Sequence, residues 1–465
     1  MSGQDTGLFG AAFADDFVSG RGRAREVLAW EGDALDGIAA SRPPFAATWS
    51  GDEIAELEEF NRACGNTAGV PLARRLADPA TLVVVTGQQP NLLGSPMYVL
   101  YKALTAWGMA GRISARSGRP VVPVFWVASD DHDFQELRQC RVWSASRGLS
   151  HIGSIVSRGG APEGSPAYAW RLGGSAERLR SALTAALPEA WANPATREAV
   201  EDALLGDPDF ETVFCRMAAR LLHSVPVLFL APRLRAMRRR QVAVLGREIA
   251  AAGETNRSVN AAAGALGRIG YSAQLHRPVD ALNVFLMHEG VRCRVLSRGR
   301  GYHVVPPGGH DAVAMFADAE ALLEELERNP DRFSPNVVTR PVVQDDALPT
   351  VAYVGGPGEI AYLAQTREAY RILRVEPSAV VPRASATLLD AEAADLLGDD
   401  AGGSALEAAL ARLVAADPDL ASVARQRRLL AEAVDAGLAG MQALDAVRHP
   451  HLRTAFEKTR RSVEW

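Results

Sequence analysis

Four short apolar runs constrain the fold of this chain more than any other feature of its sequence. They are TLVVVTG (81–87), the run 121–128 within RPVVPVFWVASDDHDF, VPVLFLAP (225–232), and the start of LPTVAYVGGPGEIAYLAQ (348–365). Short runs rich in β-branched residues are typical of strands buried on both faces of a parallel sheet. A helical pattern separates the first two runs, and strand, helix, strand predicts a right-handed parallel crossover. The sequence therefore predicts an α/β fold built on a parallel sheet.

Composition excludes several classes of protein. The 465 residues are 48% hydrophobic and 23% charged, with a formal net charge of -5. Such a chain has enough apolar surface for a core and is not intrinsically disordered. Its charge supplies no field that would gather polyanions, so we expect small-molecule substrates and no nucleic acid.

The cysteines and the amino terminus bear on the compartment. Cys64, Cys140, Cys215 and Cys293 form no CxxC pair, so neither a disulfide framework nor a zinc knuckle is indicated. The amino terminus carries acids where a secretory signal would carry basic residues, and no apolar run is long enough for a membrane span. We expect a soluble, cytoplasmic protein with no membrane partner.

Composition also suggests a division of the chain. We expect a catalytic core over residues 1–390, with insertions near 141–206 and 265–335, the second of them antiparallel. From 391 to 465 the sequence turns to Ala, Leu, Arg and Glu. Apolar residues there follow coiled-coil spacing, at Leu420, Val423, Leu430, Val434 and Met441. The basic stretch RLRAMRRRQ (233–241) is interpreted as a solvated helix face.

The first candidate site is TGQQPNLLGSP (86–96), at the end of the first run. Ligands in such folds bind beyond the carboxyl ends of the strands, near the point where strand order reverses. Ser95 is expected to cap a helix with Pro96 in its first turn, leaving N–H groups for an anion, and Met97, Leu100 and Leu104 share one helical face. A polar loop followed by a surface lysine is the alternative. The candidate binding residues are Gly87, Gln88, Gln89, Ser95, Tyr98 and Lys102.

The second candidate site is SDDHDFQE (129–136), which follows the second run. Carboxylates and a histidine crowded at a strand end suit cation binding, a donor-rich ligand or proton exchange. Asp131, His132 and Asp133 are the candidate catalytic residues. Their spacing is not that of a zinc site, and Mg²⁺ arriving with a nucleotide fits better than a permanent metal. A solvated loop that caps the next helix is the alternative.

The third candidate site is VAYVGGPGEIAYLAQ, again strand, glycine turn and helix. Read from Gly356 it satisfies GxGxxA, with Glu376 twenty residues later, so an NAD(P)-dependent oxidoreductase stays open. Glu359, however, places a carboxylate where a pyrophosphate would lie, and suits a substrate ammonium better. Gly355, Gly356, Glu359 and Gln365 are candidate binding residues.

The fourth candidate site is VVPRASATLLD (380–390). Arg383, Ser385 and Thr387 alternate along an extended piece and form a strip of donors suited to phosphate or carboxylate. An ordinary salt bridge and a turn are the alternative.

Taken together and in this order, these segments resemble the BshC family of bacillithiol biosynthesis. The matching pieces are TGQQ with GSPMYVLYK, PVFWVASDDHDFQE, FSPNVVTRPVVQDDALPTVAYVGGPGEIAYLAQ and VVPRASATLLD, from about residue 80 to 390. The resemblance implies a Rossmann-like core akin to class I nucleotidyltransferases and aminoacyl-tRNA synthetases. It also implies a carboxyl-terminal coiled coil that forms a homodimer.

The activity implied by the resemblance is a ligase reaction, in which L-cysteine is joined through an amide to the amine of glucosaminyl malate. Amide formation is unfavourable in water, so we expect ATP to activate the carboxylate, as an adenylate or acyl phosphate. Phosphates would then lie near Ser95 and Lys102, with Arg383 opposite. Asp131, His132 and Asp133 would hold the acceptor amine or remove its proton, and Glu359 would bind an ammonium group.

One departure from the family concerns the carboxyl terminus. Family members usually continue beyond the position of Trp465, which puts the dimer and any site completed by it in question. An inactive scaffold is therefore a further alternative, beside the oxidoreductase.

Overall fold

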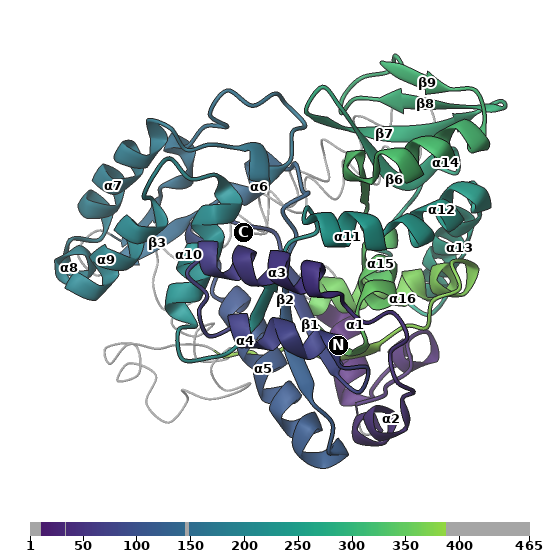
Figure 1. Cartoon of the computed structure of the whole chain (residues 1–465), viewed down its shortest axis with the longest axis horizontal. Coiled ribbons are helices and arrows are strands. Elements are labelled where there is room, and N and C mark those ends of the chain that lie inside the picture. Colours follow the sequence, from purple (N-terminus) through teal and green to yellow (C-terminus); the bar gives the residue numbers. More distant parts are fainter. Residues whose placement is uncertain (1–10, 33, 145–147, 387–465) are drawn as a thin grey trace, which may run out of the picture. The chain divides into compact units, whose positions relative to one another are not determined.

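A parallel sheet of five strands forms the centre of the computed structural model, which describes residues 11–386 except 33 and 145–147 (Figure 1). The strand order is β12-β11-β1-β2-β5 and every neighbouring pair is parallel. The strands are β1 (Leu82–Gln88), β2 (Val121–Val127), β5 (Leu228–Leu230), β11 (Thr350–Gly355) and β12 (Ala379–Pro382). The predicted α/β parallel-sheet fold is confirmed, and the four apolar runs supply four of the five strands.

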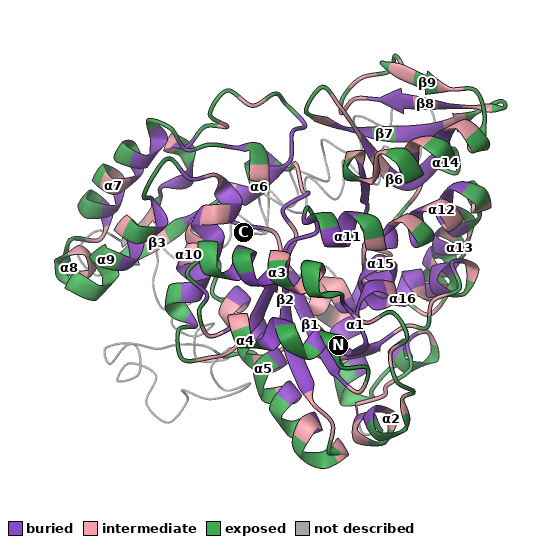
Figure 2. Ribbon diagram, viewed as in Figure 1, coloured by how far each residue is buried: buried purple, intermediate pink, exposed green. Residues whose placement is uncertain are grey.

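The central sheet is covered on both faces, which explains why its strands lack polar alternation. Val84 of β1 belongs to an apolar cluster with Ala106 and Ile113 of helix α5. The next residue, Val85, belongs to the largest cluster, together with Phe60 of helix α3. Successive side chains of a strand point to opposite faces, so both faces of β1 are buried. Figure 2 shows β2 as buried along its length and β1 as buried up to its last residue, Gln88.

Helices that precede or follow these strands surround the sheet. They are α1 (Ala11–Ser19), α2 (Leu35–Ser41), α3 (Gly51–Ala63), α4 (Val70–Ala73), α5 (Tyr98–Ser117), α10 (Phe210–Leu221), α15 (Thr339–Ala347) and α16 (Pro357–Ile372). Helix α5 buries small residues, Ala103, Ala106 and Ala110, against the sheet. Small side chains allow the helix to approach the strands closely.

Residues 134–217 supply nearly all of a second apolar cluster, which Leu92 completes. Trp170 lies at its centre, in edge contacts with Phe134 and Phe210 at centroid distances of 5.1 and 5.3 Å. The elements before α10 are α6 (Phe134–Leu137), β3 (Arg141–Ser144), β4 (Gly148–His151), α7 (Ser175–Ala186), α8 (Pro188–Ala192) and α9 (Pro194–Ala203). This region follows directly from the end of β2, so it lies at the edge where ligands bind in such folds.

A second sheet, antiparallel and of order β10-β6-β7-β8-β9, is built largely from residues 281–335. Its strands are β6 (Ala281–His288), β7 (Val291–Arg298), β8 (Gly301–Val305), β9 (Ala314–Phe316) and β10 (Phe333–Pro335). The helices beside it are α11 (Arg235–Arg240), α12 (Val242–Ala251), α13 (Glu254–Arg268) and α14 (Ala319–Arg328). The prediction of antiparallel structure here is confirmed. Arg292 N donates to Gly164 O at 2.9 Å, which ties this sheet to the 134–221 region.

Some predictions fall outside the described residues. They concern Thr387 and the coiled-coil segment 391–465 with its dimer. Within residues 11–386, apart from the four undescribed positions, no helix is both long enough and apolar enough to cross a bilayer.

Candidate functional site

The carboxyl ends of β1 and β11 lie side by side where the order of the central sheet reverses. The chain runs from β1 to β2 on one side, whereas β11 and β12 lie on the other. Such a switch point is where open α/β sheets bind ligands. Gly87 ends β1 close to β2, because a Cβ there would lie 2.8 Å from Trp126 O. The switch point brings together Gly87, Gln88 and Lys102 of the first candidate site, Gly355, Gly356 and Glu359 of the third, and Arg383 of the fourth.

Lys102 and Glu359 form a buried ion pair at this point, between helices α5 and α16. Lys102 is 1% exposed, and its Nζ also donates to Gly87 O at 2.7 Å and to Gln88 Oε1 at 2.9 Å. Glu359 accepts from Tyr353 Oη at 2.5 Å and from Gly356 N at 2.8 Å. The ammonium that Glu359 binds in the structure is therefore that of Lys102.

Burial acts on both partners of this pair. It lowers the pKa of the Lys102 ammonium, although the Glu359 carboxylate favours the charged form. Burial opposes ionisation of Glu359, but Lys102 and the two hydrogen bonds outweigh it, and the pKa of the carboxyl lies below its ordinary value. Three acceptors surround Nζ of Lys102, namely Gly87 O, Gln88 Oε1 and the Glu359 carboxylate, as suits an ammonium with three N–H donors.

Two arginines add positive charge around Glu359. Arg340 of α15 is hydrogen-bonded to Tyr362 and lies over the ring of Tyr353, with 5.6 Å from guanidinium carbon to ring centroid. Arg383 lies over the ring of Tyr98 at 5.4 Å, and its N donates to Gly355 O at 2.9 Å. We call Gln88, Lys102, Arg340, Glu359 and Arg383 the switch-point cluster. Three cations surround one carboxylate, so the cluster suits an anionic ligand.

Gln88 and Gln89 connect this cluster to the acidic segment after β2. Gln88 Nε2 donates to Gln89 Oε1 at 3.1 Å, and Gln89 Nε2 donates to Asp131 Oδ2 at 2.7 Å. Asp131 Oδ1 also accepts from the N of His132 at 2.6 Å and of Asp133 at 3.2 Å, so the backbone turns around this carboxylate. Asp133 caps helix α6 by accepting from Glu136 N at 3.1 Å and is exposed.

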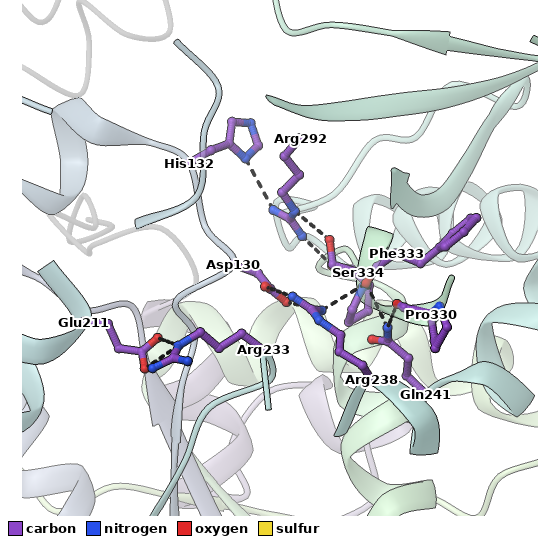
Figure 3. Close-up of polar contacts among 11 residues, drawn as sticks. Asp130, His132, Glu211, Arg233, Arg238, Gln241, Arg292, Pro330, Phe333 and Ser334 are labelled. Atoms are coloured by element: carbon purple, nitrogen blue, oxygen red, sulfur yellow. Dashed lines mark hydrogen bonds and ion pairs between the residues drawn. The ribbon is translucent and has the colours of Figure 1, made fainter. Parts of the chain in front are cut away.

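A second set of residues surrounds the end of β2, as Figure 3 shows. Arg238 of α11 forms a two-point ion pair with Asp130, at 3.0 Å between Nη1 and Oδ2 and 2.5 Å between Nη2 and Oδ1. Arg292 of β7 contacts His132, with 3.3 Å between Nη1 and Nδ1. We call Asp130, His132, Arg238 and Arg292 the β2-end cluster. Burial, then the Arg292 charge, lower the pKa of His132, against the opposing effect of the neighbouring carboxylates.

Three predicted residues do not join these clusters as expected. Helix α5 begins at Tyr98 with Met97 as N-cap, so the prediction of a Ser95 cap was wrong; Ser95 ends a 3-10 turn instead. Ser385 is exposed and accepts from Arg383 Nη1 at 2.9 Å. Gln365 is buried away from the strand ends, where its amide binds the backbone of residues 274–275.

The helix start of α16 disfavours the dinucleotide alternative. The Glu359 carboxylate already binds the free Gly356 N–H where a pyrophosphate would have to lie. Glu376 precedes β12, which begins at Ala379, so it lies at the amino end of that strand. A ribose-binding acid is needed at the opposite, carboxyl edge.

Sequence reasoning found Arg383 but missed three other arginines of the site, Arg238, Arg292 and Arg340. RLRAMRRRQ was interpreted as a solvated helix face, and this was wrong for Arg238, which is 2% exposed and paired with Asp130. Arg240 of the same helix pairs with Glu53 at 2.8 Å. No local pattern distinguishes these arginines from exposed ones, because their partners are far away in sequence. Within the part of the chain that the structure describes, no cluster of three or more His, Cys, Asp or Glu could hold a metal ion.

Comparisons with known proteins agree with this architecture. Residues 53–384 match the model of the family described as "Bacillithiol biosynthesis BshC, N-terminal Rossmann-like domain". A relative from Heliobacterium modesticaldum, named "Putative cysteine ligase BshC", is 34% identical over 72% of this chain and 61% of its own length. Relatives of the same name from Chlorobaculum tepidum and Symbiobacterium thermophilum are 34% and 33% identical, over 73% and 75% of this chain and 59% and 64% of their own. The chain thus spans about three fifths of the length of the curated relatives it matches. On this evidence the chain belongs to the BshC family of bacillithiol biosynthesis, through a Rossmann-like domain that holds both clusters.

Proposed function

We propose that this chain is a ligase of bacillithiol biosynthesis, which joins L-cysteine to the amine of glucosaminyl malate by an amide bond. Family membership and the name of the relatives support cysteine ligation. The observation that carries the proposal is the charge of the switch-point cluster: the cations Lys102, Arg340 and Arg383 lie around the carboxylate of Glu359. When ATP activates a carboxylate for reaction with an amine, the negatively charged phosphate groups need a site with such cations.

The residues present fit a nucleotide. The guanidinium of Arg383 lies beside the start of helix α5, over the ring of Tyr98, and offers a charged donor to a phosphate there, whereas the N–H groups of Val99 and Leu100 already bond to the carbonyls of Pro96 and Met97. Tyr98 contributes its ring to the same place, and burial raises the pKa of its hydroxyl to about 12, so it stays neutral. ATP, with Mg²⁺ where the phosphates carry it, would supply the free energy that amide formation requires.

The acceptor amine is placed beside the acidic segment after β2 in this proposal. Asp131 is connected to Lys102 through the two glutamine amides, so an activated carboxyl at one end and an amine at the other would meet over a continuous polar surface. Glu359 serves to hold the buried ammonium of Lys102 at the strand ends. Holding both reactants in register is a large part of what such a site contributes to rate.

The test is direct. The purified chain is incubated with L-cysteine, glucosaminyl malate and ATP, and bacillithiol and the nucleotide product are measured by mass spectrometry. We expect both products in equal amounts. Calorimetry that detects no binding of ATP or ADP would remove the nucleotide from the proposal.

Two variants test the acidic segment. Asp131→Asn and His132→Ala should each lower the rate of cysteine ligation, by about 100-fold if the segment acts on the reacting groups. Gln139→Leu is a suitable control, because Gln139 is exposed and bonds only to the backbone of α6. Wild-type rates in both variants would contradict a role for this segment in the reaction.

A further inference from the structure

His132 is held by a hydrogen bond that fixes the position of its proton. Its Nδ1 lies 3.3 Å from Nη1 of Arg292, and Figure 3 shows the two groups facing each other. A guanidinium has five N–H donors and no acceptor. Nδ1 must therefore accept the hydrogen bond and carry no proton, which leaves the proton of the neutral ring on Nε2.

Arg292 is not free to turn away from this contact. It is 6% exposed, its Nε donates to Ser334 Oγ at 2.9 Å, and its Nη2 donates to Pro335 O at 2.6 Å. Phe285 of β6 covers both partners: its ring centroid lies 3.9 Å from the guanidinium carbon and 5.6 Å from the imidazole. The geometry is thus set by β6, β7 and β10.

The charged groups facing His132 favour the neutral ring on balance. Arg292 from β7 opposes protonation, and burial opposes it more strongly. Asp131 and Asp133, on the histidine's own segment, favour protonation, but Asp131 is occupied by three N–H donors. Asp130 is neutralised by Arg238 of α11.

We propose that Arg292 is a positioning residue that holds His132 as the neutral tautomer protonated on Nε2, so that His132 donates a hydrogen bond to an oxygen of the reacting carboxyl or phosphoryl group. This inference rests on the proposed ligase function and refines it, because it replaces the expected role of His132 as a base. As the amine nitrogen bonds to the activated carbon, negative charge develops on the carboxyl oxygen; the carbon–oxygen bond to the phosphate or AMP then breaks, that group leaves with the electron pair, and the proton of the amine nitrogen passes to water. A fixed N–H donor at the carboxyl oxygen stabilises the transition state, and no proton leaves His132.

The tautomer is measured on the full chain by NMR. Long-range ¹H–¹⁵N correlation spectra of protein labelled with ¹⁵N-histidine distinguish protonated from unprotonated ring nitrogens, and His132→Asn identifies the signal. We expect a protonated Nε2 and an unprotonated Nδ1 at pH 7 in the wild type. A signal with a protonated Nδ1 would overturn the proposal without any need for an arginine variant.

Variants of two arginines then test whether Arg292 sets the tautomer of His132. In Arg292→Met the His132 signal should shift toward mixed tautomers and titrate at higher pH, because the donor and its charge are lost. Arg294→Met is the matched control, since Arg294 lies two residues along β7, is exposed and bonds to Gly309 O. An unchanged signal in a folded Arg292→Met protein would show that Arg292 does not set the tautomer.

The role of the donor is tested by activity. His132→Ala should lower kcat by about 100-fold, the usual loss on removing one oxyanion donor, whereas His132→Gln should recover about tenfold because its amide retains an N–H. Equal loss in both variants would contradict the donor role and return His132 to that of a base. Absence of ligation in the wild type would refute the proposed function and the donor role with it, whereas the spectrum alone decides the tautomer.

Discussion

The two clusters at the carboxyl edge of the central sheet are assembled in different ways. The switch-point cluster draws Lys102 and Glu359 from the helices that directly follow β1 and β11. The β2-end cluster combines His132 with Arg238 and Arg292, which come from a later helix and from the second sheet. The first depends on the fold of the core itself, whereas the second depends on how two further regions meet over it.

The largest effect is expected from breaking the ion pair of the switch-point cluster. Lys102→Met leaves the Glu359 carboxylate, whose side chain is 20% exposed, without its cation. Breaking a buried pair typically costs about 3–5 kcal/mol of unfolding free energy, and the partial exposure of Glu359 places the expected loss at the lower end of that range. Urea denaturation measures the loss. Ligation should fall as well, since the cluster loses a cation.

A matched double variant separates stability from function here. Lys102→Met with Glu359→Gln removes both charges and should recover most of the stability without recovering ligation. A double variant as unstable as Lys102→Met would show that Lys102 acts through packing and not through charge.

An intermediate effect is expected from cutting the connection between the clusters. Gln89→Leu removes the hydrogen bond to the Asp131 carboxylate, and hydrogen bonds to charged groups contribute about 1.5 kcal/mol or more. The ligation rate should fall further than the small increase in unfolded protein at the assay temperature can explain. Gln139→Leu should change stability by less than about 0.5 kcal/mol.

A smaller effect is expected at Asp133. Its carboxylate caps α6, and loss of an N-cap typically costs about 1 kcal/mol. Asp133→Asn should retain most of that stability because Asn also caps. If Asp133→Ala instead abolishes ligation in a protein of near wild-type stability, Asp133 belongs to the reacting groups and the cap is secondary.

The difference between the clusters also explains what could be predicted from sequence. The apolar runs predicted the strands, because a strand that is buried on both faces can be identified from its own residues without knowledge of its neighbours. The switch point followed from strand ends and glycine turns, and it brought Gln88, Lys102 and Glu359 together. These inferences needed only local pattern and the general topology of parallel sheets.

Prediction from the sequence failed where tertiary packing decides which side chains are buried. Of the apolar face predicted around α5, Met97 and Leu104 are 49% and 41% exposed and Leu100 is half-buried, whereas Lys102 is buried. The sheet selects the face with small residues, which periodicity of large apolar residues does not reveal. Arg238 and Arg292 could not be assigned for a related reason, because their contacts join segments more than 100 residues apart.

The smallest expected effect is a loss of unfolding free energy on mild acidification. It distinguishes the two clusters, because their contributions are lost in different pH ranges. The folded-state pKa of His132 lies below its ordinary value of 6.5, so below that pH the unfolded chain takes up the proton more readily and unfolding free energy falls. The Glu359 carboxyl has a folded-state pKa below 4.5, so its contribution is retained until the pH falls further, through that lower value. His132→Asn cannot titrate, and the difference between its stability and that of the wild type should therefore change as the pH falls below the ordinary histidine pKa of 6.5. A difference that stays constant with pH would mean that His132 has the same proton affinity in the folded and unfolded chain, and that Arg292 and burial do not disfavour its charged form.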